Sequence, residues 1–352
     1  MCPGDFKNGT STDLDMVRMV GRILNKHFAT KILDFPELGF GSRLVQSRAI
    51  PGIYLLYFHI ILGSKMKLLR ALLRTEGVVY AGYLPVIFSV VIAKRLFALK
   101  YDVVAYVAGV PQSSKAPVRL MFHLLASSLL PQCAGVVFEY GQARERYSRC
   151  AKRSVTIPSI SLDPDLVLRN HVRTTGFARQ LELGGRVLVG VIGPFYSMNR
   201  PSITYVLKNL HRFPEEIAFV FVGDVARNDL VRNNRFRFIG RVDNLFEFLR
   251  DLDCALIPRF VRTGAPMGKM VYAMAAGLPV VTNDPENAPV RNGEDVIVGR
   301  LDELPELVSE LVKKPTTMQR ISKNAKEYVL KYHNLNGAES HLLAFLEELC
   351  AQ

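Results

Sequence analysis

A short run of glycine, lysine and arginine residues near position 265 has the composition of an anion-binding loop. Residues 262–269 read Arg-Thr-Gly-Ala-Pro-Met-Gly-Lys. Gly264 and Gly268 allow close approach of the backbone, Pro266 favours the start of a helix, and Lys269 falls on the first turn of that helix. Because unpaired N–H groups and the helix dipole both favour negative charge, the run predicts a diphosphate site around Lys269.

The same residues also have a purely structural interpretation. A lysine on the first turn of a surface helix is common. The small residues at 273–277 (Ala-Met-Ala-Ala-Gly) serve close packing of a helix on a sheet rather than chemistry. The glycine-rich start ahead of Lys269 favours the binding interpretation, in which the small residues are scaffold.

Two further loops offer groups to the same ligand. Residues 193–200 (Gly-Pro-Phe-Tyr-Ser-Met-Asn-Arg) follow the apolar run 186–192, which predicts a strand. Arg200 can place a guanidinium against a phosphate, and a position in solvent is the alternative. Residues 240–242 (Gly-Arg-Val) follow another apolar run, where a simple β-turn glycine competes with a binding role.

The sequence offers no metal site. The five cysteines are scattered without a Cys-x-x-Cys pair, which indicates buried thiols in a reducing compartment. They are Cys2, Cys133, Cys150, Cys254 and Cys350. Asp163 and Asp165 flank a proline in a DxD pattern, which we interpret as a structural turn. The chain has no HExxH, GxSxG or Walker A motif, so metalloprotease, serine hydrolase and P-loop chemistry are excluded.

Short apolar runs alternate with longer helical patterns, which predicts an α/β fold with βα units around parallel sheets. Strands are expected near 30–34, 78–81, 103–107, 135–138, 155–157, 186–192, 218–222, 237–239, 254–257 and 279–281. Helices are expected at 13–26, 84–100, 117–130 and 142–150, from 202, near 244–250 and 269–276, after 302 and 316, and at 338–349.

Residues 158–185 hold turn-forming residues without a sustained strand period, so they predict a junction between two domains, 1–176 and 177–352. Doubly wound sheets bind ligands outside the carboxyl ends of their strands, so two such lobes are expected to face a ligand cleft. The loop at 4–11 should follow a first strand, but only Met1 and Cys2 precede it. Either the first domain lacks that strand, or the sequence starts after it. The last helix is expected to pack back on that domain.

The net charge of +13 is distributed unequally. The residues up to Gly176 carry 23 Lys and Arg against 11 Asp and Glu, whereas the rest carries 22 against 21. A one-sided positive field suggests an anionic partner surface, and no nucleic-acid recognition motif accompanies it. The apolar run 50–63 is too short to span a bilayer. The basic, leucine-rich run 65–74 predicts an amphipathic helix, which binds a membrane surface or, equally well, packs on a sheet through its leucines.

The second half resembles the C-terminal domain of the retaining family 4 (group 1) glycosyltransferases with the GT-B architecture. The similarity lies in FVFVGD (219–224), in RFIGRVDNLFEFLRDLDCALIPR (237–259) and above all in GKMVYAMAAGLPVVTND (268–284). The first half is similar more loosely, through 136–166 and through KNGTS (7–11), which sits where the family has a Gly-Gly loop. The resemblance implies two Rossmann-like domains that bind a nucleoside-diphosphate sugar without a metal ion.

The resemblance also implies roles for individual residues. Phosphate-facing or catalytic roles fall on Lys269, Arg200 and Gly9. Donor-binding roles fall on Gly193, Asn199, Gly223, Gly240, Arg241, Val242, Arg262, Thr263, Gly264, Ala265 and Tyr272. In this interpretation the backbone at 240–242 holds the edge of the nucleobase.

The chain departs from the family pattern at four positions. Gly264 and Tyr272 replace a pair of glutamates eight residues apart, Pro194 replaces an arginine, and Ala108 or a neighbour replaces a histidine. A tyrosine can hydrogen-bond to a ribose hydroxyl, but it cannot accept as a carboxylate does.

The leading hypothesis is sugar transfer, with retention, from a nucleoside-diphosphate donor to a lipid-linked or polysaccharide acceptor. The chain lacks the pattern of a secretory signal, so we expect it in the cytoplasm, with peripheral contact at the inner membrane face. The alternative is a catalytically degenerate GT-B protein that binds a nucleotide sugar or supports a partner transferase. A basic nucleic-acid-binding protein is the third hypothesis, and it rests on charge alone.

Overall fold

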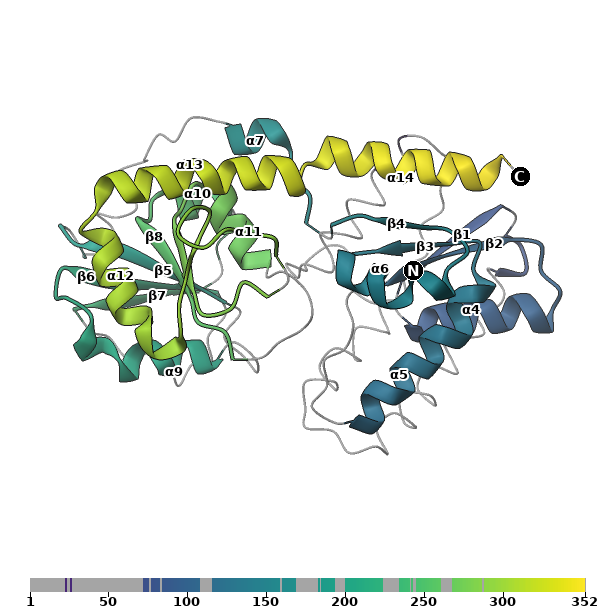
Figure 1. Cartoon of the computed structure of the whole chain (residues 1–352), viewed down its shortest axis with the longest axis horizontal. Helices are drawn as coiled ribbons and strands as arrows, with labels where there is room; N and C mark the ends of the chain where they lie inside the picture. Colours follow the sequence, from purple (N-terminus) through teal and green to yellow (C-terminus); the bar gives the residue numbers. More distant parts are fainter. Residues whose placement is uncertain are drawn as a thin grey trace. The chain divides into compact units, whose positions relative to one another are not determined.

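A computed structural model of the chain divides into two compact units, each with its own sheet (Figure 1). It describes residues 23, 26, 72–75, 77–82, 84–107, 116–158, 160–168, 183, 185–193, 200–223, 234–240, 242, 245–260, 268–286 and 288–351. The first unit holds the described residues up to Ser161 and those from Asn336 onward, and the second holds those from Leu162 to Leu335. The predicted border between 176 and 177 lies outside the described residues.

The first unit contains a parallel sheet in the order β1-β2-β3-β4. Its strands are β1 (Val78–Gly82), β2 (Asp102–Val107), β3 (Gly135–Phe138) and β4 (Ser154–Thr156). Every residue of β3 and all but the first of β2 are buried. Continuous apolar runs of this kind form strands that are covered on both faces, which is why the sequence shows them as blocks rather than as an alternation.

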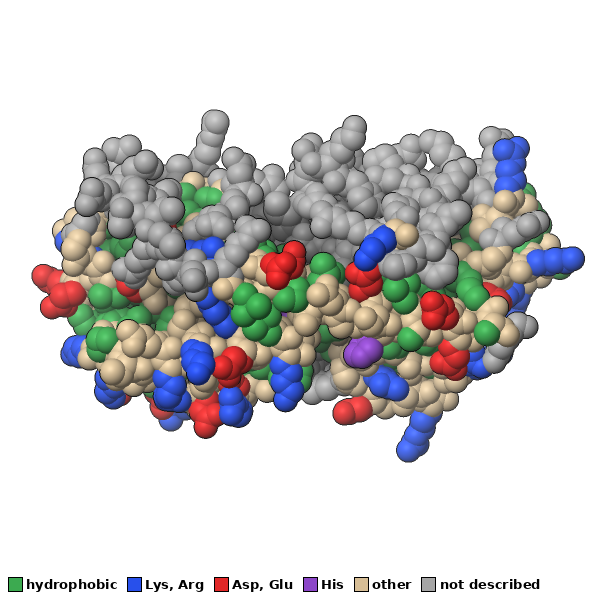
Figure 2. All heavy atoms as spheres, turned by 90° about the horizontal axis from the view of Figure 1, so that it is seen from above, with side chains coloured by type: hydrophobic (Ala, Val, Ile, Leu, Met, Phe, Trp, Pro, Cys, Tyr) green, Lys and Arg blue, Asp and Glu red, His purple; other side chains and the backbone are tan. Residues whose placement is uncertain are grey.

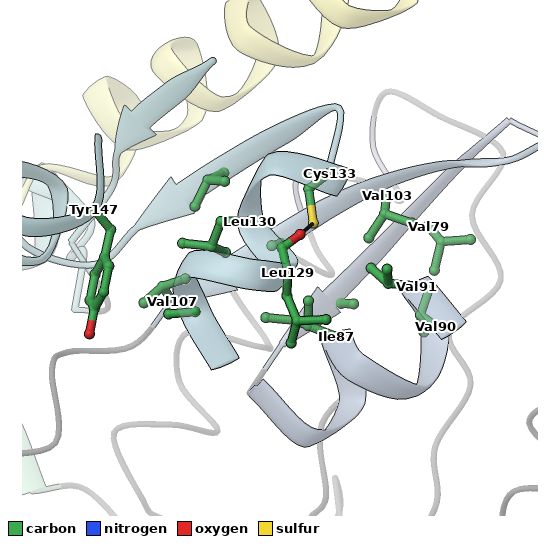
Figure 3. Packing of buried hydrophobic residues seen from close by; sticks show 14 of the residues in the cluster. Val79, Ile87, Val90, Val91, Val103, Val107, Leu129, Leu130, Cys133 and Tyr147 are labelled. Carbon is green, nitrogen blue, oxygen red and sulfur yellow. Dashed lines mark hydrogen bonds between the residues drawn. The ribbon is translucent and has the colours of Figure 1, made fainter. Parts of the chain in front are cut away.

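Helices pack on this sheet, and the first three of them connect its strands. They are α4 (Leu84–Leu96), α5 (Ala116–Leu129), α6 (Gly141–Tyr147) and α14 (Leu335–Cys350), with 3₁₀ turns η2 (Leu130–Gln132) and η3 (Ser148–Cys150). Figure 3 shows the core between them, where Val79 and Val103 of the sheet meet Ile87 and Val90 of α4 and Leu129 of α5. All of these side chains are buried, so this cluster holds the unit together.

The C-terminal helix α14 belongs to the first unit although it is the last element of the chain. It lies so close to β3 that a Cβ atom at Gly135 would come 2.5 Å from Cζ of Phe345. Arg153, beside β4, donates a hydrogen bond of 2.9 Å to the carbonyl of Glu348. The unit is therefore closed by a segment that follows the whole second unit in sequence.

The second unit contains a parallel sheet in the order β10-β9-β8-β5-β6-β7. Its strands are β5 (Val187–Ile192), β6 (Ile217–Val222), β7 (Phe236–Gly240), β8 (Cys254–Ile257), β9 (Val280–Thr282) and β10 (Ile297–Val298). The chain starts at β5, adds β6 and β7 on one side, and then returns to add β8, β9 and β10 on the other side. The strand order thus reverses between β5 and β8, which is the topological switch point of a doubly wound sheet.

Helices cover both faces of this sheet. They are α7 (Pro164–Leu168), α9 (Arg200–Lys208), α10 (Leu245–Arg250), α11 (Gly268–Ala275), α12 (Leu304–Val312) and α13 (Pro315–Tyr332), with 3₁₀ turns η5 (Leu210–Arg212) and η7 (Leu301–Glu303). Helices α9 and α12 share one apolar cluster with alternate residues of the strands. In Figure 1, α9 lies below the sheet, and α10, α11 and α13 lie above it.

Two differences from the predicted elements have a clear local cause. The junction predicted at 158–185 contains a short helix, α7, which was not predicted; the Asp163 carboxylate accepts a hydrogen bond of 2.9 Å from the N–H of Asp165 and so caps it. The helix predicted at 84–100 ends at Leu96. There Ala98 takes φ +49° and the N–H of Leu99 bonds to the carbonyl of Lys94, which closes the helix.

The described cysteines are free thiols, but not all of them are buried. Cys133 and Cys254 are buried, Cys150 is half-buried and Cys350 is exposed. The expectation of buried thiols is therefore wrong for Cys350, which lies on the solvent side of the last turn of α14. Burial raises the pKa of the Cys133 thiol to about 11, so this residue stays protonated and packs as a small apolar side chain.

None of the helices in the described part of the chain combines the length and the apolar composition that a membrane span requires. The apolar run 50–63, the strand predicted at 30–34, and most of the helices predicted at 13–26 and 65–74 lie outside the described residues. On the face drawn in Figure 2, the described Lys and Arg side chains are interspersed with Asp and Glu. Pairs such as Lys314–Glu310 and Lys323–Glu327 are examples of this local compensation in the second half.

Candidate functional site

The residues predicted to bind a diphosphate belong to the carboxyl edge of the second sheet. Each parallel strand ends at this edge, and the helix after each strand begins there. Helix α9 begins at Arg200 after β5, and α11 begins at Gly268 after β8. Because β5 and β8 are neighbours, the starts of both helices belong to the switch point, where open α/β sheets bind their ligands.

Three of the predicted glycines lie at the ends of neighbouring strands and are held together by the backbone. The N–H of Gly193 donates to the carbonyl of Val222 at 2.7 Å, and the N–H of Gly223 donates to the carbonyl of Gly240 at 2.7 Å. Gly223 and Gly240 have φ angles of +133° and +74°, which favour glycine. The sequence therefore needs glycine at both positions for backbone reasons, and the absence of side chains leaves this edge open to a ligand.

Lys269 is the second residue of α11 and is half-buried. The preceding Gly268 is buried and carries no side chain that would cover the first turn. Burial, together with the positive charge of Arg259, lowers the pKa of Lys269 to about 8. A desolvated ammonium group beside a helix N-terminus is a strong attractor for an anion, because a bound phosphate restores the stabilisation that water no longer provides.

Arg259 is a site residue that the sequence analysis did not single out. It follows β8 by two residues, is buried, and forms an ion pair with Glu286, whose side chain is 2% exposed. Its backbone is fixed by Asn283, which accepts from the N–H of Arg259 at 2.7 Å and donates to its carbonyl at 3.0 Å. The sequence did contain a signal for Arg259: it is a charged residue directly after a proline at the carboxyl end of an apolar strand.

The other predicted residues fall into two groups. Arg200 is the first residue of α9 and is exposed, Tyr272 lies half-buried one turn after Lys269, and Val242 is half-buried just after β7. The remaining predicted residues lie outside the described residues: Gly9, Asn199, Arg241, Arg262, Thr263, Gly264 and Ala265. The described part of the site is thus formed by Lys269, Arg259 and three glycines, with Arg200 on the neighbouring helix.

Acidic, histidine and cysteine side chains do not gather in groups of three anywhere in the described residues, as a metal site of protein ligands would require. The carboxylate of Asp163 accepts from the backbone at the start of α7. The predicted independence of metal ions stays a prediction.

Comparison with known proteins agrees with this geometry. Residues 186–314 match the family described as Glycosyl transferases group 1. No curated protein sequence matches the chain. The match covers β5 to α12, which includes every described residue of the site.

Solved structures resemble the chain over nearly its whole length. HepE of Anabaena in complex with UDP has a TM-score of 0.72 at 15% identity and covers 98% of each chain. A glycosyltransferase of Rickettsia africae has a TM-score of 0.69 at 12% identity, covering 99% of this chain and 97% of the other. An α,α-trehalose-phosphate synthase (UDP-forming) of Burkholderia vietnamiensis has a TM-score of 0.63 at 15% identity, covering 88% and 81%.

These structural similarities confirm the predicted fold class, which is two parallel-sheet α/β domains of the GT-B type. Because the sequence identities are low, the similarities support the fold alone. The sequence match places the glycosyltransferase pattern on the sheet that carries Lys269. Residues 186–314 thus match the family of group 1 glycosyltransferases, within a chain that has the GT-B fold.

Proposed function

We propose that this protein transfers a sugar from a nucleoside-diphosphate sugar to a lipid-linked or polysaccharide acceptor, with retention of configuration. The observation that carries the proposal is Lys269, half-buried on the first turn of α11 at the switch point of a sheet with the group 1 pattern. The structure of HepE in complex with UDP-glucose supports a UDP-sugar as the first donor to test.

In the proposed reaction the protein acts mainly by stabilising the negative charge that develops on the leaving group. When the bond between the anomeric carbon and the diphosphate breaks, negative charge grows on the leaving phosphate, and the proton of the acceptor hydroxyl moves to that phosphate as the new glycosidic bond forms. In this proposal Lys269 and the N–H groups at the start of α11 stabilise this charge. They also hold the donor in position for the acceptor.

We propose that this positive charge takes the place of a metal ion. The lysine ammonium, the Arg259 guanidinium and the helix N-terminus supply fixed positive charge at one edge of the sheet. Lys and Arg both bind phosphate oxygens, Lys as a point charge and Arg through a planar fork of donors.

We place the acceptor at the cytoplasmic face of a membrane. The support is the excess of basic residues up to Gly176, 23 against 11 acidic ones, which suits an anionic lipid surface. Flotation of the protein with vesicles of phosphatidylcholine, with and without phosphatidylserine, tests this part. Binding that needs phosphatidylserine and falls with added salt is the expected result.

The donor site is tested by thermal unfolding with UDP, GDP, ADP and their sugars. A ligand at 100 times its Kd stabilises the folded protein by about 2.7 kcal/mol. Lys269→Met is expected to remove most of this stabilisation. Lys326→Met is the matched control, because Lys326 is also a partly buried lysine with a lowered pKa, but it packs on Gly277 after the end of α11. Equal nucleotide affinity in both variants would overturn the proposal.

A second candidate function is nucleotide-sugar binding without turnover. It is favoured by Tyr272, whose phenol occupies the α11 position at which the group 1 pattern has a carboxylate. Hydrolysis of the bound donor, followed by release of UDP in the same samples, separates the two candidates. Stabilisation by UDP-sugar without any release of UDP would identify a binding protein.

A further inference from the structure

Helix α5 of the first unit exposes a row of large apolar side chains. Leu120 is 58% exposed, Leu124 is 57% exposed and Met121 is 39% exposed. Residues 120 and 124 lie one helical turn apart and residue 121 lies beside them, so the three side chains share one face of the helix. This surface is called the α5 stripe below. A contiguous exposed apolar surface of this kind marks an interaction site, whereas single exposed apolar residues are ordinary.

The opposite side of α5 is buried in the core of the first unit. Ala126 and Leu129 belong to the apolar cluster on the sheet, and Leu125 packs against it. The ring of His123 lies 5.8 Å from the buried ring of Tyr147. A helix that buries one side in a core usually has polar residues on its outer side. Because α5 is apolar on both sides, the packing of the fold does not explain the α5 stripe.

The α5 stripe faces away from the sheet. Helices α4 and α5 lie on one face of the first sheet, and α14 lies on the other face (Figure 1). Beyond Leu124 on the same side of α5, the Ser128 hydroxyl donates to the Leu124 carbonyl at 2.7 Å. The Gln132 amide donates to the Ser128 carbonyl at 2.6 Å. These bonds satisfy polar groups within the chain, which lowers the cost of removing this end of the stripe from water.

The sequence around the α5 stripe is almost entirely basic in its charges. Residues 77–138 contain a single acidic residue, Asp102, whose carboxylate pairs with Lys94 at 3.2 Å. The end of α4 also combines basic residues with exposed apolar ones, since Leu96 is 74% exposed and Phe97 is 49% exposed. Such a surface suits an anionic partner that also accepts apolar side chains. The basic residues of this segment are Lys94, Arg95, Lys100, Lys115 and Arg119.

We propose that the α5 stripe binds the surface of a membrane that contains anionic lipids. The leucines and the methionine enter the boundary between headgroups and acyl chains, and the basic residues are attracted to the headgroups. Helix α5 has 14 residues, fewer than the roughly 20 that a span requires, so it lies along the surface. This inference rests on the proposed function, which places the acceptor at a membrane, and it adds the surface that contacts the lipid.

A second copy of the chain is the other possible occupant of the α5 stripe. A symmetric dimer would place the same surface of each copy against the other, and so it would bring two basic segments together. An anionic leaflet attracts the same segment instead. The charge of residues 77–138 therefore favours the membrane.

The first experiment locates the α5 stripe relative to the lipid. The natural chain contains no tryptophan, so one introduced tryptophan reports on a single position. The emission of Leu124→Trp is expected to shift to shorter wavelength with vesicles of phosphatidylcholine and phosphatidylserine, and to be quenched when the acyl chains are brominated, because the indole leaves water. Leu168→Trp is the matched control, since Leu168 is a leucine of α7 in the second unit that is 61% exposed. Its emission is expected to stay unchanged.

The second experiment measures binding to the same vesicles by flotation. The double variant Leu120→Ser, Leu124→Ser keeps every charge, and its affinity for the vesicles is expected to fall roughly 10-fold or more, because two large apolar side chains no longer enter the lipid. Leu168→Ser is expected to bind as the natural protein does. Circular dichroism and thermal unfolding establish that each variant is folded.

The outcomes separate this inference from the proposed function. If the natural protein floats with the vesicles while the double variant floats equally well, or the Leu124→Trp emission is not quenched, the inference fails and the membrane placement stands. If the natural protein does not float, the membrane placement and the inference both fail, and the nucleotide tests of the donor site are unaffected. Sedimentation velocity without lipid tests the second copy. A dimer that the double variant converts to a monomer would overturn the inference.

Discussion

The hydroxyl of Ser202 on α9 donates a hydrogen bond of 3.0 Å to the carbonyl of Pro258 after β8. The two residues are 56 positions apart in the chain, yet they join the helix on one side of the switch point to the strand on the other side. Ser202 is 2% exposed, so no water competes for this bond. The bond therefore ties α9 to Pro258, the residue directly after β8.

Ser202→Ala is expected to lower the free energy of unfolding by about 1–3 kcal/mol, since the buried Pro258 carbonyl loses its side-chain donor. Ser340→Ala is the control, because Ser340 donates to Asn336 on the exposed side of α14. Urea denaturation of both variants measures the difference. Equal stability of the two would show that the Ser202 bond does not hold the site.

Lys269→Met is expected to change how stability depends on pH. The pKa of Lys269 is about 8 in the folded protein and near 10.5 in the unfolded chain, so the unfolded chain binds more protons between these values. The free energy of unfolding contributed by this group therefore rises as pH increases from 8 to 10.5. The variant should lack this rise and should be more stable than the natural protein at neutral pH without ligand. Lys323→Met, on the exposed side of α13, should retain the rise.

Gly240→Ala is expected to lower the free energy of unfolding by about 1–2 kcal/mol, because the residue has φ +74°. A Cβ atom there would meet nothing within 4 Å, so the loss isolates the backbone conformation from packing. Gly240→Asn should cost less, since asparagine tolerates this conformation better. Denaturation curves in which both substitutions cost the same would contradict the backbone explanation.

Gly135→Ala is expected to lower the free energy of unfolding by about 1–3 kcal/mol through overpacking. The added methyl group would come 2.5 Å from Cζ of Phe345 and 2.9 Å from Cδ1 of Leu349, so these side chains of α14 would have to move. Gly141→Ala is the control, since an added Cβ meets nothing at the start of α6. A variant as stable as the control would mean that α14 is not tightly packed on β3 in solution.

Turnover of a UDP-sugar is expected to be unaffected by an excess of EDTA, because Lys269, Arg259 and the start of α11 supply the positive charge for the diphosphate. Release of UDP with EDTA, and with added Mg²⁺, measures this. Activity that EDTA abolishes and Mg²⁺ restores would overturn the proposed independence of metal ions.

The sequence by itself determined the βα alternation and most of its elements. Strands β3 and β8 appear at the predicted residues, because a block of buried apolar residues between polar ones allows few other structures. The two-residue strand β10 and the capped turn α7 were not predicted, since each is too short to show a period. Lys269 could be proposed from the sequence because glycine, proline and lysine at the start of a helix have a local physical meaning.

Only the tertiary structure decided which residues meet at that helix. Glu286 is 27 positions from Arg259, and nothing in the local sequence pairs them. They come together because β8 and β9 are neighbours in the sheet, so the residues after both strands share one edge. Strand order depends on how the whole chain buries its apolar faces, and that is a property of the complete fold rather than of any segment.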